Sequence, residues 1–152
     1  NSLFLSSQDG LNLFLQPLKL EQMLERMREQ WPRRKISFSG PCVVRADERA
    51  LRTILSNLIQ NAIVHGGATE IFVVAKPAGE GRMHISVSDN GRGFSEDRAR
   101  LGQLFHRPRS SSGSGLGLYI SRLLLAKMSG RFELPVSPQG FQVDLWLQGA
   151  PL

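Results

Sequence analysis

Apolar and polar positions follow two rhythms along the chain, which together predict a mixture of helices and strands. From Leu18 to Met27 and again from Leu51 to Ile63, apolar residues recur every three to four positions, as on one face of an α-helix. Trp31-Pro32 is expected to end the first helix. Asp47 precedes the second segment and Gly66-Gly67 follows it, so we expect a helix capped by aspartate and ended by glycine.

Stretches rich in β-branched and aromatic residues lie between these helices and predict strands. A last helix is expected from about Leu116 to Met128. The expected strands are Ile36 to Ser39, Val43 to Ala46, a hairpin of Thr69 to Lys76 with Met83 to Asp89 across Pro77 to Gly81, and a closing hairpin of Arg131 to Val136 with Phe141 to Leu147. The order of elements predicts an α+β fold, a two-layer α/β sandwich with helices on one face of a mixed sheet.

Two segments lack a sustained period. Residues 90–114 are rich in Gly, Pro and Ser, and we expect a long mobile loop there with one helical turn near Asp97 to Leu104. Asn1 to Ser7 is expected to be the tail of a helix, ended by a turn at Gln8-Asp9-Gly10.

Composition narrows the class of protein. The 152 residues carry a formal net charge of +6, but the basic residues are scattered and there is one tyrosine, so nucleic acid binding is not expected. A solvated basic surface, or a site for an acidic ligand or partner, explains the charge equally well. Cys42 is the single cysteine, which excludes an internal disulfide. Apolar runs are too short to cross a bilayer and no signal peptide is visible, so no direct membrane contact is expected.

A row of polar residues runs beside the apolar face of the second long helix. Asn57, Asn61 and His65 are spaced by four, so they share one side of that helix. Asparagine is a poor helix former, and two in mid-helix call for a reason. An amide oxygen is a hard, neutral ligand that suits Mg²⁺. Two amides hydrogen-bonded to neighbouring loops would explain the pattern as well.

A carboxylate continues the apolar parity of an expected strand. Ile85 and Val87 share one side of that strand, and Asp89 follows them on the same side, where burial is costly unless a donor meets the carboxylate. The exocyclic amine of adenine is such a donor, whereas guanine presents a carbonyl there. Gly91 and Gly93 would let the backbone pass close to a planar base. A tight turn capped by aspartate is the alternative.

A glycine-rich segment, Gly113-Ser114-Gly115-Leu116-Gly117-Leu118, opens the last helix. Amides freed by glycine at a helix N-terminus form an anion site that favours phosphate. No Gly-Lys-Ser/Thr follows, no strand precedes and no protein-kinase motif is present, so the segment is neither a P-loop nor a dinucleotide fingerprint. A flexible linker leading into a helix is the alternative.

In this order, the segments resemble the sequence boxes of the histidine-kinase branch of the Bergerat ATPases, the superfamily that also holds gyrase, Hsp90 and MutL. Asn57 to Ala62 is similar to the N box, Asp89 to Gly93 to the G1 box, and Gly113 to Leu118 to the G2 box, while Leu104-Phe105 is similar to a reduced F box. The resemblance covers about residues 17–148 and implies the Bergerat ATP-binding fold.

The resemblance implies ligands and roles. ATP and Mg²⁺ would bind, with Asn61 as the metal ligand, Asn57 near the phosphates and Asp89 on adenine. Arg107 or Arg109 would face the γ-phosphate, and the glycines of the G2 box would be the hinge of a lid over the triphosphate. No residue of this chain is expected to be catalytic itself. The other expected nucleotide-binding residues are His65, Gly91, Gly93, Phe94, Leu104, Gly113, Ser114, Gly115, Leu116, Gly117 and Leu118.

One position separates phosphoryl transfer from hydrolysis. Relatives that hydrolyse ATP carry a glutamate four residues before the metal-binding asparagine, as a general base. Asn57 stands there and takes no proton, whereas the neutral nitrogen of a histidine acceptor needs no base. The resemblance therefore implies a protein-histidine kinase, and none of the three histidines has the sequence setting of its acceptor.

The resemblance also implies an organisation. Residues 1–10 would be the end of a dimerisation helix or linker, and residues 11–152 the catalytic ATP-binding domain, a cytoplasmic part of an inner-membrane sensor. The partners would be the dimerisation and phosphotransfer domain of the same, homodimeric protein and a response regulator. A degenerate interaction module is the alternative, because Val64 replaces a usual Lys or Arg and Phe141 a usual Thr or Ser. A gyrase-type clamp is disfavoured by Asn57.

Overall fold

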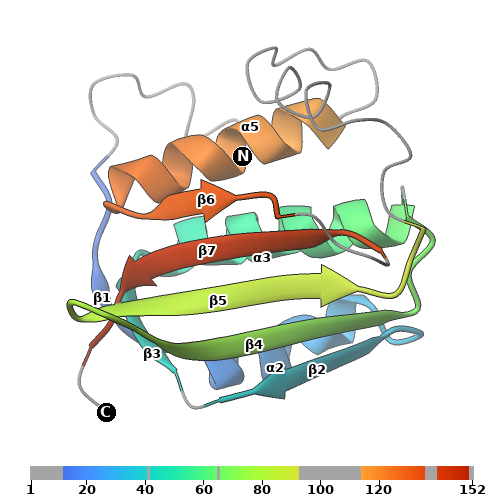
Figure 1. Ribbon diagram of the computed structural model, residues 1–152, viewed down its shortest axis with the longest axis horizontal. Coiled ribbons are helices and arrows are strands. Elements are labelled where there is room, and N and C mark those ends of the chain that lie inside the picture. The colour runs from blue at the N-terminus through green and yellow to red at the C-terminus, as the bar shows by residue number, and fades with distance from the viewer. Residues whose placement is uncertain (1–11, 41, 65, 93–113, 136–139, 151–152) are drawn as a thin grey trace.

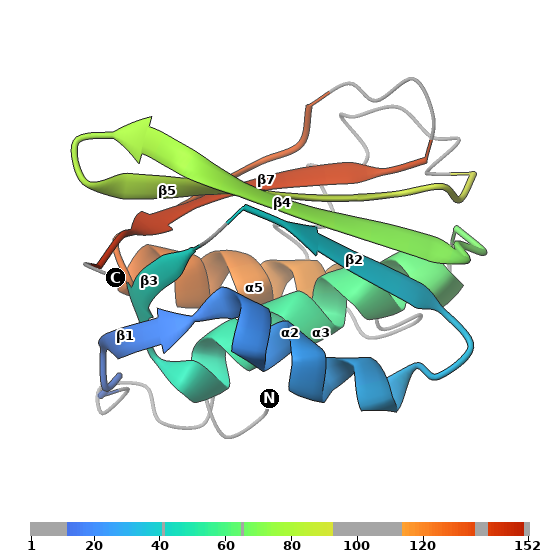
Figure 2. The same cartoon turned by 90° about the horizontal axis from the view of Figure 1, so that it is seen from below.

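The computed structural model describes residues 12–40, 42–64, 66–92, 114–135 and 140–150 (Figure 1). Two layers are seen edge-on in Figure 2, where one face of a sheet is covered by the helices α2 (Leu20–Met27), α3 (Glu48–Val64) and α5 (Ser114–Lys127). The predicted α+β two-layer sandwich with helices on one face of a mixed sheet is confirmed. No helix in the described ranges has the length and apolar character needed to cross a membrane.

The main sheet has five strands in the order β2-β4-β5-β7-β6. β2 pairs with β4 in parallel and the other neighbours are antiparallel, so the sheet is mixed. Both predicted hairpins are present, but β4 passes through Pro77 to a register shift before Gly79, and the turn is shorter than expected. The strands are β2 (Lys35–Ser39), β4 (Glu70–Gly79), β5 (Arg82–Asp89), β6 (Arg131–Glu133) and β7 (Gln142–Gln148).

A second, two-stranded sheet corrects the expected start of the first helix. β1 (Gln16–Lys19) pairs antiparallel with β3 (Val43–Ala46), with Leu18 opposite Val44. Leu18 therefore lies in a strand, although its spacing fits the apolar face of a helix. The pairing with β3 is distant in sequence and outweighs the local pattern. The helix begins only at Leu20, and a short 3-10 turn, Arg28–Gln30, extends it.

The long helix α3 begins and ends as its sequence predicts. Asp47 accepts a hydrogen bond on Oδ1 from the N–H of Ala50 at 3.0 Å, which caps the first turn. Its other oxygen, Oδ2, accepts the N–H of Phe14 at 2.8 Å and so ties the incoming chain to this helix. At the far end Gly67 adopts a φ of +65° and donates its N–H to the carbonyl of Ile63.

The core lies between the sheet and the three helices. The predicted apolar positions face it, including Leu51, Ile54 and Leu55 of α3 and Ile85 of β5, all with no exposed surface. α5 starts at Ser114, two residues before the expected start, and runs to Lys127. Residues 93–113 of the expected loop, the helical tail expected over residues 1–7 and residues 137–139 of the expected closing turn lie outside the described residues.

Candidate functional site

Helix α3 carries the two asparagines on one side. Asn61 is buried, with 7% of its surface exposed, and Asn57 one turn earlier is half-buried. His65, the third member of the expected row, lies outside the described residues. The two amides are thus held on a rigid helix whose apolar face is packed into the core, at the edge of its buried surface.

Asn57 joins α3 to α5. Its Nδ2 donates to the carbonyl oxygen of Gly117 at 3.1 Å and to the hydroxyl oxygen of Ser121 at 3.3 Å. A Cβ added at Gly117 would lie 3.4 Å from the Asn57 Cγ, in ordinary van der Waals contact, so the two helices pack closely here. The sequence assigned both residues to the nucleotide. In the structure the amide nitrogen of Asn57 is used to bind the other helix.

Asp89 ends β5 on the buried side of the sheet, as its parity predicts. The side chain is 7% exposed overall, and Oδ1 accepts the N–H of Gly91 at 2.7 Å. Burial raises the pKa of the Asp89 carboxyl above its ordinary value, and hydrogen bonds from the backbone of Gly91 and Phe141 counteract part of that rise. The carboxylate is therefore oriented by its own backbone, with desolvation as the larger influence on its charge.

Glycine contacts bring separate segments against this carboxylate. A Cβ on Gly91 would lie 2.5 Å from the carbonyl oxygen of Gly66, which accepts the N–H of Arg92 at 2.9 Å. The end of β5 thus meets the chain just after α3, five residues beyond Asn61. Gly140, with a φ of +71°, approaches from the other side, where a Cβ would lie 2.0 Å from the Asp89 carbonyl oxygen and 2.8 Å from its Oδ1.

The amide of Asn61 fits a ligand site. Its Nδ2 is fully enclosed and has no hydrogen-bond partner among the described residues. Leaving a buried amide hydrogen unpaired costs about 1–3 kcal/mol, which a ligand oxygen would relieve. The oxygen of the same amide is the type of neutral donor that Mg²⁺ accepts. The residues present therefore fit a nucleotide phosphate with its metal ion at this position.

Other predicted residues divide into three groups. Leu118 has no exposed surface and packs in the core, so it anchors α5 instead of facing a ligand. Ser114, Gly115 and Leu116 form the first turn of α5, whose backbone N–H groups have no helical partner. The remaining predicted residues lie outside the described ranges: His65, Gly93, Phe94, Leu104, Arg107, Arg109 and Gly113.

Sequence reasoning missed three residues of this site. Ser121 read as one position of a helix, Gly140 as part of a hairpin turn, and Gly66 as a helix stop. Each acts through a contact with a segment distant in the chain: Ser121 bonds a residue 64 positions away. The local signals, a serine among apolar residues and two glycines at turns, are too common to indicate a binding site.

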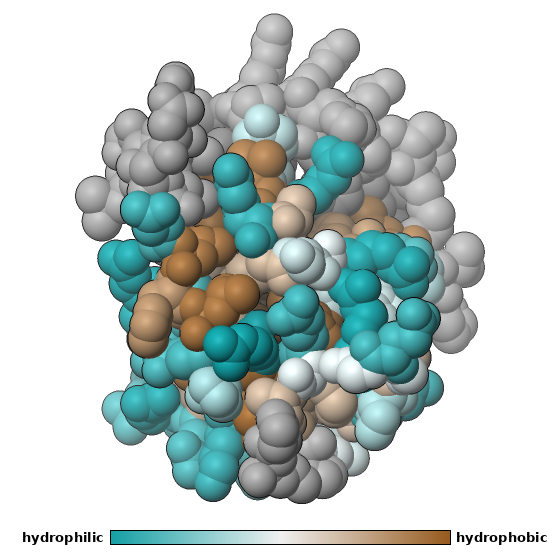
Figure 3. Space-filling view, turned by 90° about the vertical axis from the view of Figure 1, so that its left-hand side faces the viewer, coloured by the Kyte–Doolittle hydropathy of each residue, from teal (hydrophilic) through white to brown (hydrophobic). Residues whose placement is uncertain are grey.

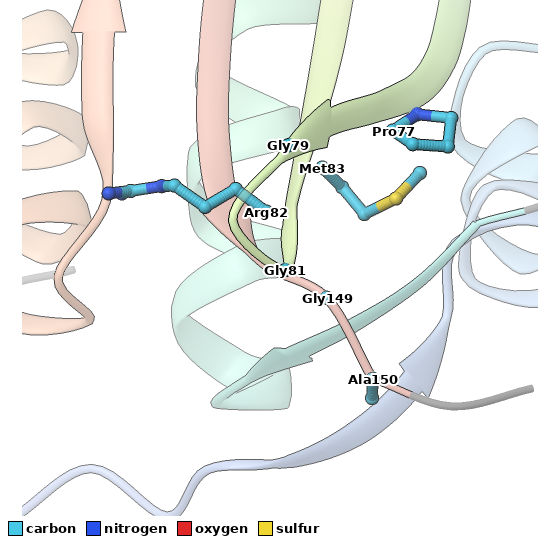
Figure 4. Close-up of a pocket in the computed structure, with 7 residues that line it drawn as sticks. All are labelled: Pro77, Gly79, Gly81, Arg82, Met83, Gly149 and Ala150. Carbon is cyan, nitrogen blue, oxygen red and sulfur yellow. The ribbon is translucent and has the colours of Figure 1, made fainter.

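A separate cavity lies at the opposite end of β5. It measures about 410 Å³ and is lined by Pro77, Gly79, Gly81, Arg82, Met83, Gly149 and Ala150. In Figure 4 the Arg82 side chain extends away from it towards β6, which leaves mostly apolar walls. This end of the molecule faces the viewer in Figure 3, where brown apolar patches lie among hydrophilic ones. Because β5 spans Arg82–Asp89, the cavity lies about 23 Å from Asp89 and is not part of the site around it.

Comparison with known proteins identifies what this arrangement resembles. Residues 46–151 match the family described as histidine kinase-, DNA gyrase B-, and HSP90-like ATPase. The sensor-type histidine kinase PrrB of Mycobacterium leprae (strain TN) is 33% identical over 135 residues, which are 82% of this chain and 30% of that protein. The chain spans a third or less of the length of the curated relatives it matches.

Comparison with solved structures also gives histidine kinase ATP-binding domains. The ATP binding domain of PrrB from Mycobacterium tuberculosis superposes with a TM-score of 0.72 at 26% identity, covering 90% of this chain and 98% of that one. Full-length ShkA, solved in complex with AMPPNP, superposes with a TM-score of 0.72 at 30% identity, covering 93% of this chain and 33% of that one. The fold of this chain is therefore that of histidine kinase ATP-binding domains.

Proposed function

The chain belongs to the family of histidine kinase-, DNA gyrase B- and Hsp90-like ATPases, and within this family it is a catalytic ATP-binding domain of the histidine kinase type. We propose the following mechanism for this domain. The domain binds ATP with Mg²⁺ and presents the γ-phosphoryl group to a histidine on a separate dimerisation domain. The observation that carries the proposal is the contact of Gly66 with Gly91, which brings the end of the Asn57–Asn61 helix against the Asp89 strand.

Asp89 recognises the adenine base. Its Oδ1 already accepts the N–H of Gly91, which fixes the plane of the carboxylate and leaves lone pairs for a second donor. The exocyclic amine of adenine supplies that donor, and guanine has a carbonyl in its place. We therefore expect ATP to bind in preference to GTP, because a carboxylate facing a carbonyl leaves both acceptors unpaired.

Asn61 binds the phosphate groups of the nucleotide and their metal ion. Its enclosed, unpartnered Nδ2 is suited to a phosphate oxygen and its carbonyl oxygen to Mg²⁺. When bound, Mg²⁺ supplies positive charge that neutralises the phosphate oxygens. The N–H groups in the first turn of α5, at Ser114 to Leu116, have no partner within the helix and favour the same anionic group from a second helix. Arg107 or Arg109 is proposed to add charge at the γ-phosphate.

Asn57 favours phosphoryl transfer over hydrolysis. An amide takes no proton from water, and here its nitrogen is occupied by Gly117 and Ser121 of α5. The acceptor imidazole brings an unprotonated nitrogen that is nucleophilic near neutral pH, so the domain needs to position the nucleotide and not to activate water. This chain accordingly binds, orients and shields ATP, while the nucleophile comes from elsewhere.

The relatives support a proposal for the organisation of the longer protein. They are sensor histidine kinases, and the chain spans a third or less of their length. We propose that residues 1–10 are the end of a dimerisation helix or a linker and that residues 11–152 form the catalytic ATP-binding domain. We also propose that the complete protein is a homodimer that passes phosphate to a response regulator. We also propose a cytoplasmic place for this domain in an inner-membrane sensor.

The proposal is tested by calorimetry of nucleotide binding with and without Mg²⁺. The wild-type domain is expected to bind ATP more tightly with Mg²⁺, and Asn61→Ala is expected to lose that gain, by about tenfold for one ligand contact of 1–3 kcal/mol. Gln60→Ala is the matched control, because this exposed amide on the same helix bonds Trp31 instead. Absence of ATP binding at millimolar concentration would instead indicate a degenerate module, and steady ATP hydrolysis by the domain alone a gyrase-type clamp.

A further inference from the structure

The hydrogen-bonding capacity of the Asn57 side chain is divided between its two ends. An asparagine amide has two N–H donors on Nδ2 and one carbonyl acceptor. The nitrogen has two acceptors on α5, the Gly117 carbonyl oxygen at 3.1 Å and the Ser121 hydroxyl oxygen at 3.3 Å. Both donors are therefore used within the protein. The carbonyl oxygen has no partner among the described residues and is the end that a ligand can use.

Ser121 lies where it can fix the orientation of the Asn57 amide. It has no exposed surface, and it follows Gly117 by one helical turn, so both acceptors lie on the same side of α5. A serine hydroxyl can accept the Asn57 N–H, while the Gly117 carbonyl can only accept and so requires the amide nitrogen to face it. Rotating the amide by half a turn would point its oxygen at the Gly117 oxygen, two acceptors without a hydrogen between them.

We propose that Ser121 is a positioning residue that acts through Asn57. By holding Nδ2 against α5 together with the Gly117 carbonyl, it orients the Asn57 oxygen as an acceptor towards the nucleotide, available to Mg²⁺ or to the water bound to it. This inference rests on the proposed function, since it concerns the same nucleotide. It makes the seating of α5 on α3 a condition for Mg²⁺-dependent binding, without Ser121 touching the ligand.

A purely structural role for Ser121 makes a different prediction. If the buried hydroxyl only contributed to packing, any variant of equal destabilisation on α5 would have the same effect. Ile120→Val provides that comparison, because Ile120 is 2% exposed on the same helix and loses one methylene without a polar contact. Ser56→Ala, on α3 next to Asn57, controls for removal of a hydroxyl, because the Asn57 side chain bonds Gly117 and Ser121 and not Ser56.

The first measurement uses the nucleotide-free domain. The side-chain N–H signals of Asn57 in a nitrogen-15 NMR spectrum are expected to show slowed hydrogen exchange in the wild type, in Ile120→Val and in Ser56→Ala. Ser121→Ala removes one of the two acceptors, so exchange is expected to accelerate several-fold. Unchanged exchange in Ser121→Ala would overturn the proposal. This arm involves no ligand, so it decides the orientation of the amide even if the wild type fails to bind ATP.

The second measurement compares ATP affinity with and without Mg²⁺. Ser121→Ala is expected to keep the metal-free affinity and to lose about fivefold of the gain from Mg²⁺, the equivalent of one neutral hydrogen bond. Ile120→Val is expected to lower the unfolding temperature by a similar amount and to keep the full gain. The proposal is wrong if Ile120→Val reproduces the loss, or if Ser121→Ala weakens binding equally with and without the metal.

Discussion

At the scale of single residues, the site contains a carboxyl group, Asp89, whose burial makes its ionised form energetically unfavourable. Asp89 lies on the apolar side of the sheet, and burial raises its pKa despite the backbone hydrogen bonds from Gly91 and Phe141. An ionised group with a raised pKa lowers the stability of the folded state at neutral pH. Such a cost is typical of a binding residue whose partner is a ligand and not the protein itself.

The pH dependence of this residue can be measured in both stability and binding. A raised carboxyl pKa contributes stability that is full below the unfolded pKa and is lost as pH rises through the folded pKa. The free energy of unfolding of the wild type should therefore improve relative to Asp89→Asn as pH falls from 7 towards the ordinary aspartate value of about 3.9. Denaturant unfolding of both proteins at several pH values checks this.

Binding should change in the opposite sense. The adenine amine needs the ionised carboxylate, so ATP affinity of the wild type should fall with falling pH, and Asp89→Asn should bind about tenfold or more weakly at pH 7, for the loss of a charged hydrogen bond of about 1.5–3 kcal/mol. Asp144→Asn is the control, since Asp144 pairs with His84 on the other face of the sheet. Equal ATP affinity of Asp89→Asn and wild type would contradict the adenine role.

The sequence indicated Asp89 because strand parity is a local property, whereas the partners of Asn57 were not predictable. Parity requires only that Ile85, Val87 and Asp89 alternate with polar residues. The Asn57 amide instead bonds residues 60 and 64 positions away, and that distance is bridged only when α5 packs on α3. The side-chain role of an amide in a helix therefore depends on the tertiary structure.

At the scale of elements, prediction was accurate where local signals agree. Helix α3 combines an apolar period, the Asp47 cap and a terminal glycine, and its bounds follow from these. Strand β1 was missed because Leu18 also fits a helical period, and only its pairing with Val44 decides the conformation. Local agreement thus predicts an element, while a short strand is defined by its neighbour.

Close approach between elements gives a prediction with a matched control. Gly140 and Gly81 have nearly equal φ values, +71° and +73°, but a Cβ meets Asp89 at the first and open space at the second. Gly81→Ala should cost about 1–2 kcal/mol for the left-handed backbone. Gly140→Ala should cost a further 1–3 kcal/mol or so for overpacking and, by displacing Asp89, weaken ATP binding.

Denaturant unfolding and ATP titration of the two variants separate the effects. If the contact of Gly140 with Asp89 shapes the site, only Gly140→Ala binds ATP more weakly than the wild type. Equal losses of stability in both variants, with equal ATP affinity, would show that the contact with Asp89 has no influence on the site. Both glycines lie in segments that connect antiparallel strands, so each variant is compared within the same protein.

At the scale of the whole molecule, the candidate residues gather at one end of the sheet. The end of β5, the chain after α3 and the approach to β7 meet around Asp89 through Gly66, Gly91 and Gly140, while α5 is bound to α3 by Asn57. The apolar cavity near Arg82 lies at the other end of β5 (Figure 4). The polar, glycine-lined site and the apolar cavity therefore lie at opposite ends of the sheet.

The decisive experiment is a crystal structure of the domain with Mg²⁺ and a non-hydrolysable ATP analogue. We expect the exocyclic amine of adenine within hydrogen-bond distance of the Asp89 carboxylate, and the side-chain oxygen of Asn61 at about 2.1 Å from the metal ion. A nucleotide bound elsewhere, or one seated at Asp89 with its metal ion away from Asn61, would contradict this expectation.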